Sequence, residues 1–177
     1  CQALGVPWSR KYESDGGPGI IAIMDFLNAS DLRDIDREQF LRAQLVFFLI
    51  GAVDGHAKNF SITLLPSGFQ LAPVYDVLSI LPALARRQVN RKEAKLAMAV
   101  GKNRHYRLDE ISIRHWEQTA KKTGFPLRDL HSLIHDLRER ADKLETTVNR
   151  IDKKISPYLV DSIMAGIKKH LYAFGIF

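Results

Sequence analysis

The length and composition of the chain place it among ordinary globular proteins. It has 177 residues, of which 46% are hydrophobic and 26% are charged, and its formal net charge is +6. This length suits one domain or one lobe of a larger domain, and the composition excludes a disordered or fibrous protein. The longest apolar run, residues 45–53, is about half of the roughly 20 residues that a membrane helix needs. The single cysteine, Cys1, excludes an internal disulfide framework and favours a reducing cytoplasm.

The positive charge is concentrated after residue 80. Residues 86–107 contain eight Lys and Arg residues against one acidic residue, Glu93. Such a stretch attracts the phosphates of nucleic acid or an acidic protein surface. For a basic run taken alone, a solvated loop is the simpler interpretation. The chain also begins with Cys1 rather than Met and continues as an ordinary internal sequence, so we expect it to be a fragment of a longer polypeptide.

The first elements expected along the chain are a loop and two helices. Residues 11–19 contain three glycines and no periodicity, which indicates a loop, and the apolar residues of 20–27 predict a short helix. Asp36 is expected to cap a second helix that runs to residue 50. This helix is apolar on most sides near its end, which predicts a buried end, and Gly51 should stop it.

A polar loop and a hairpin follow. Residues 51–59 are irregular, whereas residues 60–64 alternate as a strand does. Pro, Ser and Gly at 66–68 predict a turn, and residues 69–72 predict the return strand. A short helix is expected at 77–84. The polar loop therefore lies between two apolar elements, which is where functional residues are often held.

The second half is expected to be mostly helical. A second short hairpin is expected around residues 95–101, and a helix from Ser112 should end at Gly124. Residues 127–151 predict a long helix with one apolar stripe, and a last helix is expected at 157–174. The stripe consists of Leu127, Leu130, Ile134, Leu137, Ala141, Leu144, Val148 and Ile151. It could pair with a coiled-coil partner, but core packing is favoured. The sequence thus predicts a mainly α fold with one or two small β-hairpins.

The polar loop has a spacing that suggests chemistry. Asp54 and Asn59 are five residues apart, and Asp76 follows the predicted hairpin. Protein kinases place a catalytic Asp and a metal-binding Asn at this separation, and a second metal-binding Asp follows. Phosphoryl transfer needs a proton acceptor near the substrate hydroxyl and oxygen ligands that hold Mg²⁺ on the phosphates. Lys58 could neutralise charge that develops on the transferred group.

Each of these residues also has a simpler interpretation. An Asp-Gly pair such as Asp54-Gly55 is usually a turn, and Asn59 could cap the entry to the strand. A loop histidine such as His56 is more often packed or solvated than a ligand, and Asp76 could cap the helix that follows. Taken singly, the simpler interpretations are favoured. The complete set, in this order and separated by a hairpin, is much harder to obtain by chance.

The same residues resemble a known family. Asp-Gly-His-Ala-Lys-Asn-Phe-Ser at 54–61 and Leu-Ala-Pro-Val-Tyr-Asp-Val-Leu-Ser at 71–79 closely resemble the HipA serine/threonine kinase toxins, as do 11–20 and 95–98. The resemblance implies that residues 1–177 form a kinase-like C-terminal lobe that uses ATP and Mg²⁺. It also implies a HipB-like antitoxin partner and a protein substrate, which is a glutamyl-tRNA synthetase in the best-known members.

The resemblance assigns roles by position. It implies that Asp54 is the catalytic proton acceptor and that Asn59 and Asp76 are the Mg²⁺ ligands. The residues implied to contact ATP are His56, Ala57, Lys58, Asn59, Tyr75 and Asp76.

The chain departs from the usual protein-kinase sequence in two respects, and the first limits the activity that we expect of the chain alone. It has no glycine-rich phosphate loop followed by a strand lysine, and Pro18 removes a backbone donor from the only glycine cluster, residues 16–19. Val77 follows Asp76, so no Asp-Phe-Gly exists either, but this departure is shared by the HipA family. We therefore expect the N-terminal lobe to be absent and the fragment alone to be inactive.

Two other functions compete with this hypothesis. The chain could act as a corepressor module that holds an antitoxin and contacts operator DNA through residues 86–107. A degenerate kinase that binds nucleotide without turnover is the third hypothesis, and the intact set of Asp54, Asn59 and Asp76 argues against it.

Overall fold

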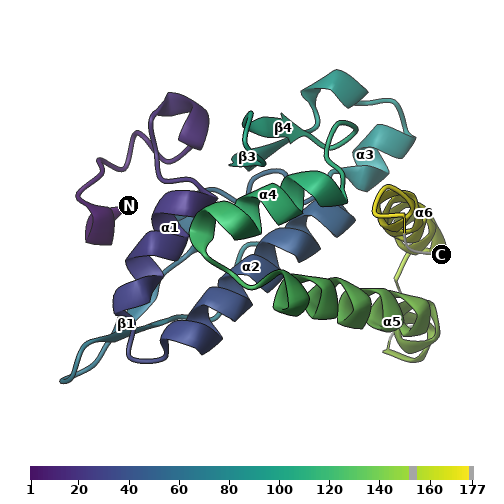
Figure 1. Cartoon of the computed structure of the whole chain (residues 1–177). Helices are drawn as coiled ribbons and strands as arrows, with labels where there is room; N and C mark the ends of the chain where they lie inside the picture. The colour runs from purple at the N-terminus through teal and green to yellow at the C-terminus, as the bar shows by residue number, and fades with distance from the viewer. Residues whose placement is uncertain (152–154, 176–177) are drawn as a thin grey trace.

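The computed structural model describes residues 1–151 and 155–175, without the side chains of residues 145 and 149–151. The described residues form a mostly helical body with two separate two-stranded antiparallel sheets (Figure 1). The α-helices are α1 (Ile20–Phe26), α2 (Arg33–Ile50), α3 (Leu81–Ala85), α4 (Ile113–Thr123), α5 (Leu127–Ile151) and α6 (Pro157–Tyr172). The strands are β1 (Ile62–Leu64), β2 (Phe69–Leu71), β3 (Lys95–Val100) and β4 (His105–Arg107). This architecture confirms the predicted mainly α fold with two hairpins.

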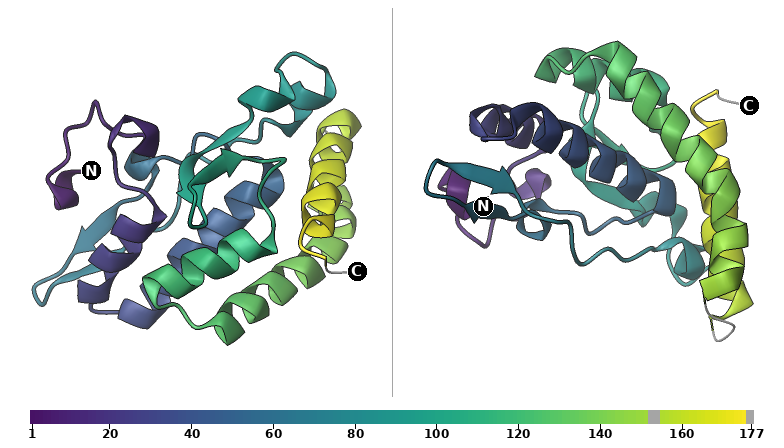
Figure 2. Two further views of the ribbon diagram at one scale, coloured as in Figure 1. Left: turned by 45° about the horizontal axis from the view of Figure 1, so that its top comes forward. Right: turned by 90° about the horizontal axis from the view of Figure 1, so that it is seen from below.

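Helix α2 is the central element of the core. It contacts α1, α5 and α6, and Figure 2 shows α5 and α6 beside its C-terminal half. Its inner face buries large side chains completely, among them Phe40, Leu45 and Phe48. Burying one such side chain contributes roughly 1.5–3 kcal/mol. Gly51 ends the helix in the left-handed conformation, with φ 63°, as the sequence predicted. The polar loop of residues 51–59 therefore begins at a rigid, buried helix end.

The start of α2 differs from the prediction. The helix begins at Arg33, so Asp36 lies within its first turn rather than at its N-cap. The Asp36 carboxylate is only 2% exposed, and it accepts hydrogen bonds from the Ser30 hydroxyl and from the backbone N–H of Leu71 at 2.7 Å. The predicted cap at Asp36 is wrong because this carboxylate finds donors outside the helix. It joins α2 to β2 instead.

The short helix after the first hairpin also begins later than predicted. Residues 77–79 are not helical, and α3 begins at Leu81 with Pro82 in its first turn. Proline suits that place because its fixed φ is already helical and its missing N–H needs no partner there. Asp76 therefore does not cap this helix, so the simpler interpretation of Asp76 is wrong.

Both predicted hairpins are present. In the first, Ile62 pairs with Leu71 and Leu64 pairs with Phe69. Strand β1 begins at Ile62 rather than at Phe60, whose ring instead packs edge-on against Phe40. The second hairpin pairs β3 with β4 through an irregular register, and most of β3 is buried.

The apolar stripe of α5 packs into the core. Leu130, Ile134 and Leu137 are buried, and α5 contacts α2, α4 and α6. This confirms core packing in place of a coiled-coil partner, although the side chain of Ile151 lies outside the described residues. Ser112 and Gly124 flank α4 as predicted. The last helix ends at Tyr172, two residues earlier than expected.

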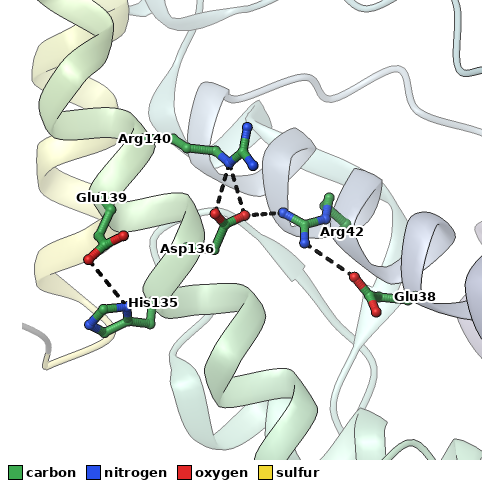
Figure 3. Close-up of polar contacts among 6 residues, drawn as sticks. All are labelled: Glu38, Arg42, His135, Asp136, Glu139 and Arg140. Atoms are coloured by element: carbon green, nitrogen blue, oxygen red, sulfur yellow. Dashed lines mark hydrogen bonds and ion pairs between the residues drawn. The ribbon is translucent and has the colours of Figure 1, made fainter.

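An ion-pair network fixes α5 to α2 (Figure 3). The Asp136 carboxylate of α5 accepts hydrogen bonds from Arg42 of α2 and from Arg140 at 2.9 Å, and Arg42 also pairs with Glu38 at 3.2 Å. These side chains are partly exposed, so each pair stabilises the fold by only about 0–1 kcal/mol. Within residues 1–151 and 155–175, none of the helices has the length and apolar character of a membrane span.

Candidate active site

The loop after α2 presses against the helix that precedes it. A Cβ atom added to Gly55 would lie 2.2 Å from Cδ2 of Phe47, a buried ring of α2. Only glycine lets the backbone approach so closely. Within the loop, the N–H of Ala52 donates to the carbonyl of Phe47 at 2.7 Å, and that of His56 to the carbonyl of Asp54 at 2.9 Å. The loop is therefore held in one shape.

Asp54 presents its carboxylate at the surface of this loop, where its side chain is 60% exposed. Its Oδ1 accepts a hydrogen bond of 2.6 Å from the hydroxyl of Tyr12, and Nε2 of His56 lies 3.8 Å from the same oxygen. Among the residues that the structure describes, Oδ2 receives no hydrogen bond. An exposed carboxylate oxygen without a partner can accept a proton from a substrate group.

His56 and Asn59 are buried beneath Asp54, with exposed fractions of 6% and 2%. The His56 ring packs edge-on against Tyr12, with 5.1 Å between the centroids. Burial lowers the pKa of His56, so the ring is neutral at physiological pH. The backbone N–H of His56 donates to Oδ1 of Asn59 at 3.1 Å, and this contact orients the Asn59 amide.

The structure brings Asn59 and Asp76 together. The Asn59 Nδ2 donates to Oδ2 of Asp76 at 3.2 Å, although 17 residues separate them in the sequence. Asp76 has φ 59°, a left-handed conformation that few residues other than glycine adopt. Arg87 and Arg104, outside this site, share this conformation, so it fixes the backbone at Asp76 without marking function by itself. The two residues predicted to bind metal thus lie side by side.

Tyr75 and Lys58 lie on another side of the loop. The Tyr75 hydroxyl donates to the backbone carbonyl of Lys58 at 2.6 Å, and it lies 3.0 Å from the Ser61 hydroxyl. Tyr75, Lys58 and Ala57 also line a cavity of about 800 Å³. Its other walls come from residues 1–8, α1 and the first hairpin. Asp54, His56, Asn59 and Asp76 do not line this cavity, so the predicted site residues divide into two groups, each with residues from the loop 51–59 and one residue from the segment after β2.

The predicted loop 11–19 contributes contacts that we did not assign from the sequence. Tyr12 reaches Asp54, and the Glu13 carboxylate accepts a hydrogen bond of 2.5 Å from the N–H of Ala99 in β3. The sequence did mark this stretch, because it is one of the four that resemble the HipA kinases. No local pattern in the sequence indicates which residues Tyr12 and Glu13 contact.

A family model described as the HipA-like C-terminal domain matches residues 1–145. The chain belongs to this family. Among curated proteins, the putative kinase Y4mE of Sinorhizobium fredii is 33% identical over 165 residues, which cover 92% of this chain and 36% of that protein. The serine/threonine-protein kinase toxin HipA of Shewanella oneidensis is 28% identical, over 98% of this chain and 40% of that protein. The chain thus spans about two fifths of the length of these relatives.

A solved structure has the same fold. The complex of HipA, HipB and operator DNA from Shewanella oneidensis contains a chain that matches with a TM-score of 0.78 and 21% identity. The match covers 99% of this chain and 43% of that one. The mainly α lobe described above is therefore the fold of the corresponding part of HipA, which is kinase-like.

Proposed function

We propose that the chain is the catalytic-loop lobe of a HipA-like kinase that transfers the γ-phosphoryl group of ATP to a serine or threonine hydroxyl. In this proposal Asp54 accepts the hydroxyl proton. The observation that carries the proposal is the hydrogen bond of 3.2 Å that joins Asn59, on the loop that presents Asp54, to Asp76 on the segment after β2. Phosphoryl transfer depends mainly on such positioning and on electrostatic stabilisation.

The nucleotide is proposed to lie along the same loop. His56, Ala57, Lys58, Asn59, Tyr75 and Asp76 are the residues that we expect to contact ATP. The cavity beside Tyr75 and Lys58 has apolar walls that suit a flat base, because ligand pockets are mainly apolar with a few polar groups. The exposed Lys58 ammonium would neutralise charge on the phosphoryl group.

Mg²⁺ fits the donor set at Asn59 and Asp76. Magnesium binds through one or two carboxylates, waters and substrate phosphates rather than through a full protein cage. The Asp76 carboxylate supplies a ligand of that type. The Asn59 amide oxygen would supply a second one, but here it accepts from the backbone N–H of His56 while Nδ2 faces Asp76, so the amide would have to turn over to share an ion with Asp76. When bound, the ion would neutralise the phosphates. The chain's own contribution is to hold the two side chains at a fixed separation.

The activity is proposed for a longer polypeptide than residues 1–177. The curated relatives are more than twice as long as the matched region, and the chain offers no glycine-rich phosphate loop. We expect residues 1–177 alone not to phosphorylate protein. The HipA resemblance makes a glutamyl-tRNA synthetase the first substrate to test, and a cytoplasmic location is part of the same proposal.

Asp54→Asn in the full-length protein tests the assignment. The substitution keeps the size of the side chain but removes the proton acceptor, and general-base catalysis contributes roughly 10²- to 10⁴-fold. We expect kcat for phosphoryl transfer from radiolabelled ATP to fall by at least about 10²-fold with an unchanged melting temperature. Asp109→Asn, which changes an exposed aspartate that pairs with Arg107, is the matched control. Wild-type kcat in the Asp54→Asn protein would refute the proposed function.

The second candidate function is antitoxin and operator-DNA binding through residues 86–107. Within this stretch, Arg87, Arg91 and Lys92 are exposed cations, whereas Arg107 is paired with Asp109 at 2.7 Å. The solved complex of the HipA neighbour contains HipB and operator DNA, which favours this candidate. An unpaired cation that contacts a phosphate releases counterions, so binding through these residues should weaken as salt rises.

A charge reversal tests this candidate. Arg87, Arg91 and Lys92 are changed together to Glu, and operator binding is measured with antitoxin present at two salt concentrations. Each lost phosphate contact should reduce the salt slope by about 0.9. Arg107→Glu is the control because its guanidinium already has acidic partners. An unchanged slope in the triple variant excludes DNA contact through these residues.

A further inference from the structure

Residues 11–19 form a strut between the second hairpin and the catalytic loop. On one side, the N–H of Ala57 donates to the carbonyl of Lys11 at 3.2 Å. On the other side, the Glu13 carboxylate accepts from Ala99 of β3. The strut is closed on itself, because the N–H of Gly17 donates to the carbonyl of Tyr12 at 2.8 Å. Tyr12 therefore has a backbone that is fixed from both directions.

The strut requires its glycines. A Cβ atom on Gly17 would lie 2.3 Å from the carbonyl oxygen of Arg10, and one on Gly19 would lie 2.3 Å from the carboxyl carbon of Glu13. At Gly17 the crowding atoms belong to the backbone, so no side chain fits there, whereas a side chain at Gly19 would displace the Glu13 carboxylate from its place. The close packing of residues 11–19 thus places Tyr12 against Asp54 and Glu13 against Ala99.

The Tyr12 hydroxyl is aimed at one oxygen of Asp54. The two oxygen atoms lie 2.6 Å apart, which is a short hydrogen bond of the kind made to an ionised acceptor. The hydrogen bond to Asp54, followed by burial, raises the pKa of Tyr12 to about 12. The phenol therefore keeps its proton at physiological pH and acts as the donor. The edge-on contact with His56 fixes the direction in which the phenol ring points.

We propose that Tyr12 is a positioning residue that holds Oδ1 of Asp54 and thereby presents Oδ2 to the substrate hydroxyl. The inference rests on the proposed function. As the substrate oxygen forms its bond to the γ-phosphorus, the bond from that phosphorus to the ADP oxygen breaks, and the hydroxyl proton moves to Oδ2. Tyr12 keeps its own proton throughout. Without it, the half-exposed carboxylate rotates between orientations, and only some of them accept the proton.

His56 cannot replace Tyr12 in this role. Its Nε2 lies 3.8 Å from Oδ1 of Asp54, which is beyond hydrogen-bond distance. Tyr12 is thus the donor that orients Asp54, among the residues that the structure describes.

Kinetics of the full-length kinase test the proposal. Tyr12→Phe removes only the hydroxyl, and we expect kcat to fall about 10-fold, a part of the roughly 10²- to 10⁴-fold that a general base contributes. The KM for ATP and the melting temperature should not change, since the phenyl ring still packs on His56. Tyr158→Phe is the matched control. It likewise deletes a single phenol hydroxyl, but one that donates to the backbone carbonyl of Pro82 at 2.8 Å rather than to Asp54.

The outcomes separate the inference from the proposed function. If Asp54→Asn abolishes transfer and Tyr12→Phe keeps wild-type kcat or raises it, the positioning role is wrong while the kinase assignment stands. If Asp54→Asn keeps activity, both fail. A fall in kcat that Tyr158→Phe reproduces equally would also overturn the positioning role, since it would reflect a general loss of rigidity.

A spectroscopic measurement tests the contact without any activity. The ¹³Cζ resonance of Tyr12, assigned from its loss in Tyr12→Phe, is followed by NMR in the full-length protein from about pH 8 to about pH 11. An ordinary tyrosine titrates near 10. The raised pKa of Tyr12 should therefore keep it in the phenol form in the wild type, and Asp54→Asn should move it towards phenolate. Identical titration in the two proteins would show that Tyr12 does not donate to Asp54.

Discussion

Gly55→Ala tests whether close packing of the loop on α2 sets the geometry of the site. Gly55 has no positive φ, so its backbone is open to alanine and only space opposes the change. The new methyl would lie 2.2 Å and 2.4 Å from two ring carbons of Phe47, whereas ordinary carbon contacts are near 3.5–4.0 Å. Since Phe47 is 3% exposed, the ring cannot simply turn into solvent.

The loop must therefore shift by about 1 Å or more, and Asp54 shifts with it because it is the preceding residue. Overpacking of this kind costs about 1–3 kcal/mol, which should lower the melting temperature of the lobe within the full-length protein. The effect on transfer should be larger, because a misplacement of 1 Å can lower kcat by about 10²-fold. The KM for ATP should change much less than kcat.

The assay combines thermal unfolding with steady-state kinetics of the full-length protein. Phe47→Leu supplies the matched partner, because it removes the ring atoms that the new methyl meets. The double variant should recover part of the melting temperature and of kcat that Gly55→Ala loses, a coupling expected between contacting residues. Wild-type stability and kcat in Gly55→Ala, or no recovery in the double variant, would refute the reasoning.

Two further predictions concern stability. Asp36→Ala should lower the free energy of unfolding by about 1–3 kcal/mol, because it leaves buried donors unpaired; chemical denaturation should show this, while the exposed Asp34→Ala should have little effect. His170 is buried, burial lowers its pKa, and its Nδ1 contacts the Leu49 carbonyl at 2.9 Å. Below about pH 6.5 the unfolded chain therefore binds more protons at this histidine than the folded chain does, so acid favours unfolding. The melting temperature should therefore fall as the pH drops to about 5.5, less in His170→Gln than in the control His135→Gln.

The sequence predicted the site best where the determinants are local. The separation of Asp54 and Asn59 and the stop at Gly51 depend on a few adjacent residues, so they could be read directly. The meeting of Asn59 with Asp76 depends on the length of the intervening hairpin, and only the order of elements could be predicted. The contact from Tyr12 to Asp54 spans 42 residues, and no periodicity encodes it.

Two predictions were wrong, the helix cap at Asp36 and the start of the helix expected at 77–84, and both involve contacts between residues far apart in the sequence. Asp36 has the residue type and spacing of a helix cap, but a backbone donor in β2, far along the chain, provided the partner that it uses. The expected helix at 77–84 lost its first turn because Pro82 favours the start of a helix and because Ser79 is tied to the carbonyl of Ile50 at 2.5 Å. A tertiary contact contributed to both errors and could not be predicted from the sequence, whereas the signal of Pro82 is local.

The contacts around the loop explain why a surface aspartate can be held accurately. Asp54 is exposed, yet the loop that carries it is held by α2 through Gly55, by the strut through Tyr12, and by the segment after β2 through Asp76. These three supports come from elements that are far apart in the sequence, so no single element can shift without breaking contacts to the others. Precise placement is what phosphoryl transfer requires. Substitutions in residues 11–19 should therefore reduce kcat although these residues lie outside the loop, as the expected fall in Tyr12→Phe illustrates.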